Sequence, residues 1–198
     1  MNFRGPKVKL SRSLGLPLTP QAAEIMKRRP YGPGQHGQAR SRKPSEYKVQ
    51  LLEKQRVRFQ YNISERQMSN YFERAARANG ATGEVLIQLL ETRLDAFVYR
   101  AGFARTIYAA RQYVTHGHLL VNGKAVNIPS YSLKVGDVVS VKPNSSLLQQ
   151  MEEALKSASQ PAYISVINGN SARFVQMPGR EDVPVIGELS LVVEYYSR

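Results

Sequence analysis

Residues 45–101 repeat apolar side chains at spacings of three and four, which predicts a series of amphipathic helices. Ser45 is a residue type that caps helix N-termini, and a helix is expected to follow it. Its predicted inward face consists of Val49, Leu52, Arg56 and Phe59. Its other faces carry cations that would meet solvent or phosphate: Lys48, Lys54 and Arg58.

The two helices expected next have recognisable ends. Ser64 with Gln67 three residues later forms a capping box, and Asn79-Gly80 is a natural stop. Thr82 then opens a third helix, which the apolar pattern carries without interruption to Gly102.

Beyond Thr106, which caps a fourth helix ending near Val114, the period changes from helix to strand. Asn122-Gly123 predicts a tight hairpin. The strands and the helix expected in this part are strands 119–121, 124–126 and 138–141, helix 147–157, and strands 163–167 and 172–176. Residues 189–196 fit either a strand or a helix. The pattern therefore predicts an α+β fold.

Residues 1–44 differ from the rest because glycine and proline interrupt them too often for long elements. We predict an extended basic arm with at most a short helix at 22–29. Few of its residues are apolar, so much of the arm is expected to become ordered on a partner.

Charge is concentrated in that region. Residues 1–60 hold 14 Lys and Arg against 3 Glu, whereas residues 142–198 are nearly neutral, and the whole chain carries a formal charge of +13. Such polarity favours a polyanionic partner, whose counterions are released on binding. A basic protein charged only for solubility is the alternative.

The composition also excludes several classes of protein. There is no cysteine, which removes disulfides, thiolate catalysis and cysteine-based metal sites. The first residues lack the apolar stretch of a secretory signal, and no run is long enough to cross a bilayer. We expect a cytoplasmic protein without membrane contact.

Three motifs could carry chemistry, and each has a simpler explanation. The glycine-rich stretch 32–40 does not have the form of a phosphate loop and fits close approach of backbone to a nucleic acid better. His116 and His118 have no carboxylate spaced to complete a metal site. Asp95 in Arg-Leu-Asp resembles the catalytic aspartate of pseudouridine synthases, but no catalytic sheet domain surrounds it. It is expected in mid-helix, as a structural or RNA-orienting residue paired with an arginine.

Residues 93–141 are similar to the small RNA-binding domain named after ribosomal protein S4, which also occurs in pseudouridine synthases, a heat-shock protein and tyrosyl-tRNA synthetases. The flanking segments resemble the bacterial-type family of this small-subunit ribosomal protein. They are GPKVKLSR at 5–12, PGQHG at 33–37, SEYKVQLLEKQRVRFQY at 45–61, SERQMSNYFERAAR at 64–77, TGEVLIQLLETRLD at 82–95 and LVVEYYSR at 191–198. The similarity covers nearly the whole chain.

The resemblance implies a non-catalytic protein without cofactor that binds small-subunit ribosomal RNA early and nucleates assembly. It also implies a place beside the channel through which messenger RNA enters, an influence on decoding accuracy, and contact with ribosomal protein S5, without homo-oligomers. The N-terminal zinc-binding cysteines of some members are absent here, so no metal is expected.

The resemblance further implies a domain order that periodicity alone does not reveal. An all-helical domain of residues 45–91 is completed by 188–198, and the RNA-binding domain, two helices packed on a small antiparallel sheet, is inserted between them as residues 92–187. On this basis residues 189–196 become a helix packed on the first domain.

We expect recognition by shape and phosphate, with few base contacts. The residues expected to contact RNA are Lys7, Lys9, Arg12, Arg28, Arg29, Tyr31, His36, Arg40, Arg42, Lys43, Lys54, Arg56, Arg58, Arg93, Arg100, Arg105, Thr106, Arg111, His116, His118, Asn122 and Lys124. Two rivals are an RNA-modifying enzyme anchored by this domain, and a stand-alone chaperone acting on stalled large subunits.

Overall fold

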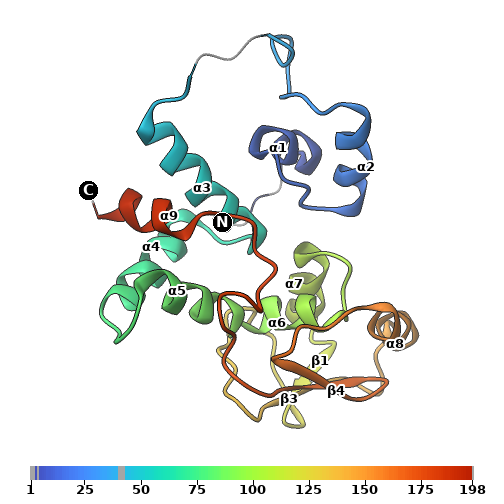
Figure 1. The fold of residues 1–198 in the computed structure, drawn as a ribbon. Coiled ribbons are helices and arrows are strands. Elements are labelled where there is room, and N and C mark those ends of the chain that lie inside the picture. Colours follow the sequence, from blue (N-terminus) through green and yellow to red (C-terminus); the bar gives the residue numbers. More distant parts are fainter. Residues whose placement is uncertain (1–2, 4, 40–42, 198) are drawn as a thin grey trace. The chain divides into compact units, whose positions relative to one another are not determined.

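The computed structural model describes residues 3, 5–39 and 43–197 (Figure 1). The chain divides into two compact units. The first contains Met1–Gly83 and Val185–Arg198, and the second, inserted in the first, contains Glu84–Pro184.

The first unit is helical in the part that the structure describes. Its elements are α1 (Lys7–Leu14), α2 (Pro20–Arg28), α3 (Glu46–Gln60), α4 (Glu65–Ala76) and α9 (Leu189–Tyr196). The predicted caps are present, because Ser45 accepts a hydrogen bond from the backbone of Lys48, and Ser64 with Gln67 forms the capping box.

The prediction of an extended arm is wrong for residues 7–14, which form α1, whereas α2 at 20–28 corresponds to the short helix expected at 22–29. Leu14, Leu16 and Leu18 are buried, and the Ser11 hydroxyl accepts a hydrogen bond from the backbone of Leu18. Thr19 caps α2, with proline at its first position. Three leucines at alternate positions across the turn supply the apolar contacts that the composition of the arm seemed to lack.

The inward face of α3 also differs from the prediction. Gln50, Glu53, Lys54 and Val57 are buried, whereas the expected residues Val49, Leu52, Arg56 and Phe59 are half-buried. Polar pairing explains the difference: Glu53 accepts a hydrogen bond from the backbone of Glu188, and the Gln50 amide donates to Glu194. A count of apolar spacings cannot detect a buried face made of such pairs.

Residues 189–196 form a helix, as the family resemblance implied. α9 packs along α3, and the two lie side by side in Figure 1. One ring contact accompanies this packing, Tyr47 of α3 with Tyr195 at 5.8 Å between centroids, and a second joins α9 to α4, Phe72 with Tyr196 at 4.7 Å.

The third predicted helix is interrupted. It forms α5 (Thr82–Glu91) and α6 (Leu94–Ala101), separated by Thr92 and Arg93. Here the backbone forms hydrogen bonds with a loop that is distant in the sequence. Leu94 N–H donates to the Tyr131 carbonyl, and Leu133 N–H donates to the Thr92 carbonyl. These bonds replace helical ones, and they place Asp95 in the first turn of α6 and not in mid-helix.

The second unit contains α5, α6 and the remaining elements. They are α7 (Ile107–Thr115), β1 (Leu119–Val121), β2 (Lys124–Ala125), β3 (Val138–Val141), α8 (Leu148–Ser157), β4 (Ile164–Asn168) and β5 (Ser171–Phe174). Among the described residues the sheet has five antiparallel strands in the order β2-β1-β3-β5-β4. The α+β prediction is confirmed.

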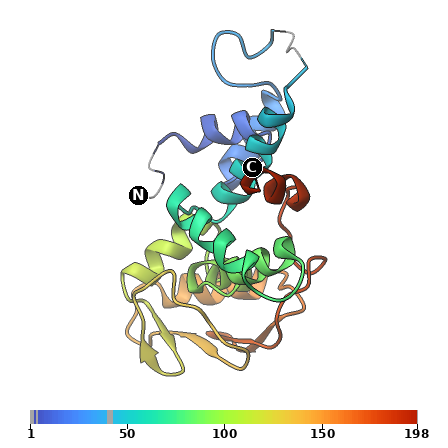
Figure 2. The ribbon, with the colours of Figure 1, turned by 90° about the vertical axis from the view of Figure 1, so that its left-hand side faces the viewer.

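α6 and α7 pack against one face of this sheet, as the side view in Figure 2 shows. Phe97 of α6 meets Phe174 of β5 edge to face at 6.0 Å between centroids. Alternation along β1 and β3 sends Leu119, Val121, Val139 and Val141 into this core. Within the described part of the chain, every helix is too short or too polar to cross a membrane.

Candidate nucleic-acid interface

The α6–α7 pair is fixed at both ends of its connection. Gly102 ends α6 in the left-handed conformation, with φ of 95°, and Thr106 caps α7 by accepting a hydrogen bond from the backbone of Ala109. Ile107, Ala110 and Val114 are buried on the inner side of α7. The connection therefore holds the outer sides of the two helices in a defined arrangement.

Asp95 is the centre of a buried ion-pair cluster. Its carboxylate accepts two hydrogen bonds from Arg93, at 2.9 and 2.7 Å, and a third at 3.0 Å from Nη1 of Arg111 on α7. The Asp95 side chain is fully buried and that of Arg93 is 1% exposed. The expected pairing of Asp95 with an arginine is confirmed, and a carboxylate with both oxygens occupied has a structural role.

A second buried carboxylate, Glu91, holds Arg100 in the same way. Nε of Arg100 donates to both Glu91 oxygens at 3.0 and 3.3 Å, and the Tyr163 hydroxyl donates to Oε2 at 3.0 Å. Burial of Tyr163 and the adjacent negative charge of Glu91 raise the pKa of its hydroxyl, which keeps it protonated as a donor. Glu91 and Asp95 thus position two arginines near the helix surface.

The charged side chains of residues 94–118 that remain exposed are all positive. From residue 94 to residue 118 the charged residues are Asp95, which is buried, and Arg100, Arg105 and Arg111. Arg105 is exposed, and Arg100 and Arg111 keep 11% and 17% of their side chains exposed. A surface of fixed guanidinium groups without an exposed carboxylate attracts phosphate.

The predicted hairpin at Asn122-Gly123 is present between β1 and β2. Asn122 and Gly123 both have positive φ, 49° and 76°, as a two-residue turn of this type requires. The Asn122 side chain donates to Asp137 and accepts from the backbone of Val138, so it stabilises the turn. Lys124 is exposed beside it.

The opposite end of β1 holds the two histidines. Nδ1 of His118 lies 3.0 Å from the Ser145 hydroxyl, its backbone carbonyl accepts from Lys142, and the ring of exposed His116 lies 6.1 Å away. No group of three metal-ligating side chains occurs among the described residues. The arrangement suits hydrogen bonding to a polar partner.

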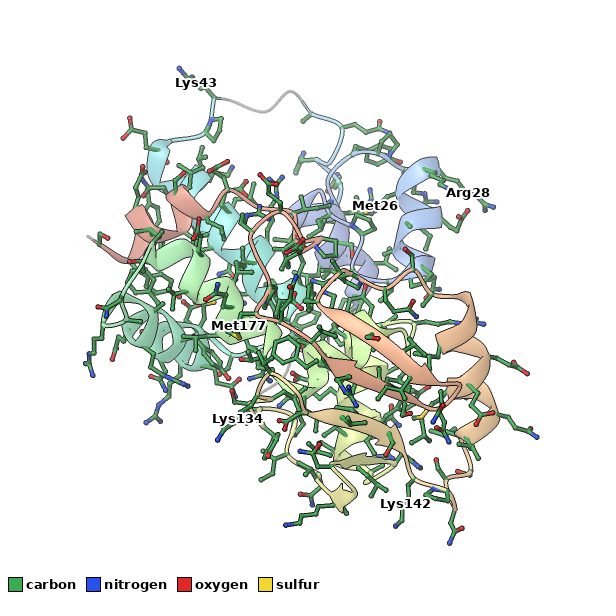
Figure 3. The ribbon with its side chains drawn as sticks, turned by 60° about the horizontal axis from the view of Figure 1, so that its bottom comes forward. Met26, Arg28, Lys43, Lys134, Lys142 and Met177 are labelled. Carbon is green, nitrogen blue, oxygen red and sulfur yellow. The ribbon has the colours of Figure 1, made fainter. Side chains whose placement is uncertain are left out.

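In the first unit, Arg12 organises the start of the glycine-rich stretch. Its guanidinium donates to the carbonyls of Tyr31 and Gly32 at 3.0 and 2.9 Å and stacks over the Tyr31 ring at 5.0 Å. Arg28 and Lys43 are exposed and project away from this unit in Figure 3. Arg40 and Arg42 lie outside the described residues.

Two of the predicted contact residues are buried, so little of either side chain is exposed to a partner. Arg93 is enclosed by its pairing with Asp95. Lys54 is 3% exposed, donates to Glu65 at 2.7 Å and lies 4.6 Å from the centre of the Tyr195 ring. Arginine and lysine in a sequence signal surface charge only when pairing with a carboxylate does not enclose the whole side chain.

The other predicted residues fall into two groups by exposure. Those exposed are Lys9, Arg28, Arg29, His36, Lys43, Arg105, His116, Asn122 and Lys124. Those half-buried are Lys7, Arg12, Tyr31, Arg56, Arg58, Arg100, Thr106, Arg111 and His118. Arg56 donates to the Leu14 carbonyl and pairs with Glu53, and Arg58 lies over the Phe59 ring, which leaves both with mainly structural contacts.

The sequence reasoning missed two exposed lysines of the second unit. Lys134 precedes the turn before β3 and Lys142 follows that strand, so they stand at opposite ends of it, and both lie on the outside of the unit in Figure 3. Each is a single lysine next to a turn. Only their positions, beside the turn Val135-Gly136-Asp137 and directly after the strand residue Val141, could have indicated from the sequence that they are exposed.

Comparison with known protein families shows to which class of protein the chain belongs. Residues 2–91 match the family model described as ribosomal protein S4/S9 N-terminal domain, and residues 92–139 match the S4 domain. The chain is thus an RNA-binding protein of the S4-domain class.

Similar proteins of known identity indicate a particular family within this class. The small ribosomal subunit protein uS4 of Micrococcus luteus is 51% identical over 198 residues, covering 96% of this chain and 95% of the relative. That of Streptomyces avermitilis is 49% identical and covers 100% of this chain and 99% of the relative. That of Chlorobium phaeovibrioides is 46% identical, covering 99% and 98%.

The chain belongs to the uS4 family of small ribosomal subunit proteins. Members of this family are cytoplasmic structural components of the ribosome and not enzymes, and membership implies direct binding to ribosomal RNA. The enzyme rival is thereby excluded, in agreement with the fully occupied carboxylate of Asp95.

Proposed function

We propose that the chain binds small-subunit ribosomal RNA through the α6–α7 surface and through four exposed cations of its first unit, Lys9, Arg28, Arg29 and Lys43. One observation carries the proposal: every exposed charge between residues 94 and 118 is positive, and two of the three arginines there are fixed by buried carboxylates. Fixing a guanidinium before binding reduces the entropy lost when it meets a phosphate.

The contacts are expected to read RNA shape and phosphate and not base sequence. Arg100, Arg105 and Arg111 supply the phosphate contacts of the second unit, with Lys124 and His118 at its margins. In the first unit α1 and α2 are folded and already present Lys9 and Arg28 at the surface. A preformed surface of this kind suits early binding to folded RNA and nucleation of assembly.

Two finer roles follow from family membership. We infer that Lys43, together with Arg40 and Arg42, lies beside the channel through which messenger RNA enters, and that the protein contacts ribosomal protein S5 and so influences decoding accuracy. Support for the first is the exposure of Lys43 next to a basic run. Co-sedimentation of the tagged protein with small and not large subunits tests its place in the ribosome and discriminates against the chaperone rival.

The salt dependence of RNA binding tests the central proposal. Affinity of the full chain for a fragment of the 5′ domain of small-subunit ribosomal RNA is measured by filter binding over a series of salt concentrations. We expect a steep fall, and Arg105→Ala should reduce the slope of log K against log salt by about 1.

The matched control for this measurement is Arg77→Ala. Arg77 is 82% exposed in its side chain and lies beyond α4, outside the proposed surface, so its removal should leave the slope unchanged. A flat salt dependence of the unaltered protein, or equal slopes for Arg105→Ala and wild type, would contradict the proposal.

A further inference from the structure

The second unit contains a cavity of about 290 Å³ between the C-terminal ends of α6 and α8. Its walls are largely apolar, with Ala104, Ala154, Ala158 and Pro161 among them. Its polar lining comes from Arg100, Arg105 and Ser159, and Tyr99 closes one side. The described lining residues include two cations and no carboxylate.

The cavity is formed where the end of α6 packs closely against the end of α8. Gly102 has φ of 95°, and a Cβ added to it would lie 2.2 Å from the Cβ of Ala158, so the end of α8 approaches the end of α6 as nearly as the backbone permits. The amide of Gln160 ties the same two elements together by donating to the carbonyls of Ala101 and Leu155. These contacts give the cavity a fixed shape.

The two arginines are held differently. Arg100 donates a hydrogen bond from Nε to the buried Glu91 carboxylate, which holds the side chain in place. Its guanidinium lies 5.3 Å from the centre of the Tyr99 ring. Arg105 stands on the α6–α7 connection and is exposed. One arginine is therefore held in place in the lining, and the other is an exposed cation of the same lining.

We propose that this cavity takes one unstacked nucleotide of the bound RNA, with the base between the apolar walls and its phosphate on Arg105. Aromatic rings and guanidinium planes are the surfaces on which proteins stack splayed-out RNA bases. The volume lies at the lower end of the range for small-ligand pockets, so it excludes a duplex. The Ser159 hydroxyl is available for a base edge or a 2′-hydroxyl.

This inference rests on the proposed RNA binding and adds to it one contact with a nucleobase. The first test uses nucleoside 5′-monophosphates as probes of the full-length protein, followed by amide chemical shifts in NMR, with ribose 5-phosphate as the probe that lacks a base. We expect shifts clustered on Gly102, Ala154 and Ala158, larger with the nucleotides than with ribose 5-phosphate. Equal shifts with both probes, or none at these residues, would overturn the proposal.

The second test fills the cavity. Ser159→Trp should abolish the nucleotide shifts and weaken binding of the ribosomal RNA fragment about tenfold, the size expected for one lost stacking contact, without changing the salt slope. The matched control is Ser165→Trp, at an exposed position of β4, which should bind as wild type does.

The two proposals fail separately under these measurements. If Ser159→Trp binds RNA with wild-type affinity while that affinity remains steeply salt-dependent, the proposal of a nucleotide pocket is refuted. The proposal of an RNA-binding surface is then unaffected. Arg105→Ala gives an independent check on the pocket, because it should weaken monophosphate binding in the absence of any RNA. Unchanged monophosphate shifts in that variant would also overturn the phosphate assignment.

Discussion

At the scale of single residues, the arginines of the second unit divide into structural and surface groups according to the carboxylates near them. Arg93 donates from Nε and Nη2 to both oxygens of Asp95 and is buried, whereas Arg111 donates to the same carboxylate and keeps part of its side chain exposed. A residue's type therefore does not decide its role here; the extent to which its side chain is enclosed does.

Removing the Asp95 carboxylate should destabilise the fold severely. Asp95→Ala removes the carboxylate that pairs with the buried Arg93 guanidinium, and breaking a buried pair in this way costs about 3–5 kcal/mol in the free energy of unfolding. Urea unfolding monitored by circular dichroism measures the loss. Asp95→Asn, which keeps the shape of the side chain, should lose most of the same stability.

A surface pair provides the comparison for Asp95. Glu73→Ala removes the partner of Arg77, an exposed pair at 3.9 Å, and should change the unfolding free energy by no more than about 1 kcal/mol. Similar losses for Asp95→Ala and Glu73→Ala would show that the buried cluster is not what holds α6 and α7 together.

Glu65 makes stability in the first unit depend on pH. Burial alone would raise the pKa of this carboxyl, but hydrogen bonds from Lys54 and Tyr196, with the charges of Lys54 and Arg58, lower it below its usual 4.5. A lowered folded-state pKa stabilises the protein above the unfolded value, and that stability is lost as the pH falls through the folded value.

We therefore expect Glu65→Gln to be less stable than wild type at neutral pH and to lose less stability as the pH is lowered below about 4.5. Urea unfolding at a series of pH values measures both effects. Tyr196→Phe removes one of the hydrogen bonds and should lie between the two proteins. Parallel curves for wild type and Glu65→Gln would refute this account.

At the scale of elements, the helix caps were predictable, whereas the break between α5 and α6 and the buried face of α3 were not. The caps at Ser45, Ser64 and Thr106 depend on residues three positions away and are confirmed. The break between α5 and α6 depends on hydrogen bonds to a loop about 40 residues later, which no local pattern contains. The buried face of α3 depends likewise on polar partners in α4 and α9.

The close approach of α6 and α8 predicts an unusual sensitivity at Gly102. Gly102→Ala combines a left-handed backbone, at about 1–2 kcal/mol, with a clash against Ala158, and should lower the unfolding free energy by more than the backbone cost alone. Gly136→Ala is the matched control, since its φ of 96° is nearly the same and nothing lies within 4 Å of the added Cβ. Equal losses in thermal unfolding would mean that the clash is relieved without cost.

At the scale of the whole molecule, the concentration of positive charge in residues 1–60 was correctly taken as a sign of a nucleic-acid partner. The helix α1 was not predicted, because the burial of Leu14, Leu16 and Leu18 and the hydrogen bond from the Leu18 backbone to the Ser11 hydroxyl are tertiary contacts that composition does not reveal. The domain boundaries predicted at 91/92 and 187/188 stay a prediction: the family models meet at 91/92, and the compact units divide after Gly83 and after Pro184.

The sequence by itself determined the helix caps, the Asn122-Gly123 hairpin, the α+β class and the family, since each rests on neighbouring residues or on quoted motifs. The tertiary structure alone decided which cations remain at the surface. Arg111 meets Asp95 across 16 positions of the chain, and Tyr163 meets Glu91 across 72. Charge pairing at such separations depends on how the helices and the sheet pack, and local sequence carries no record of it.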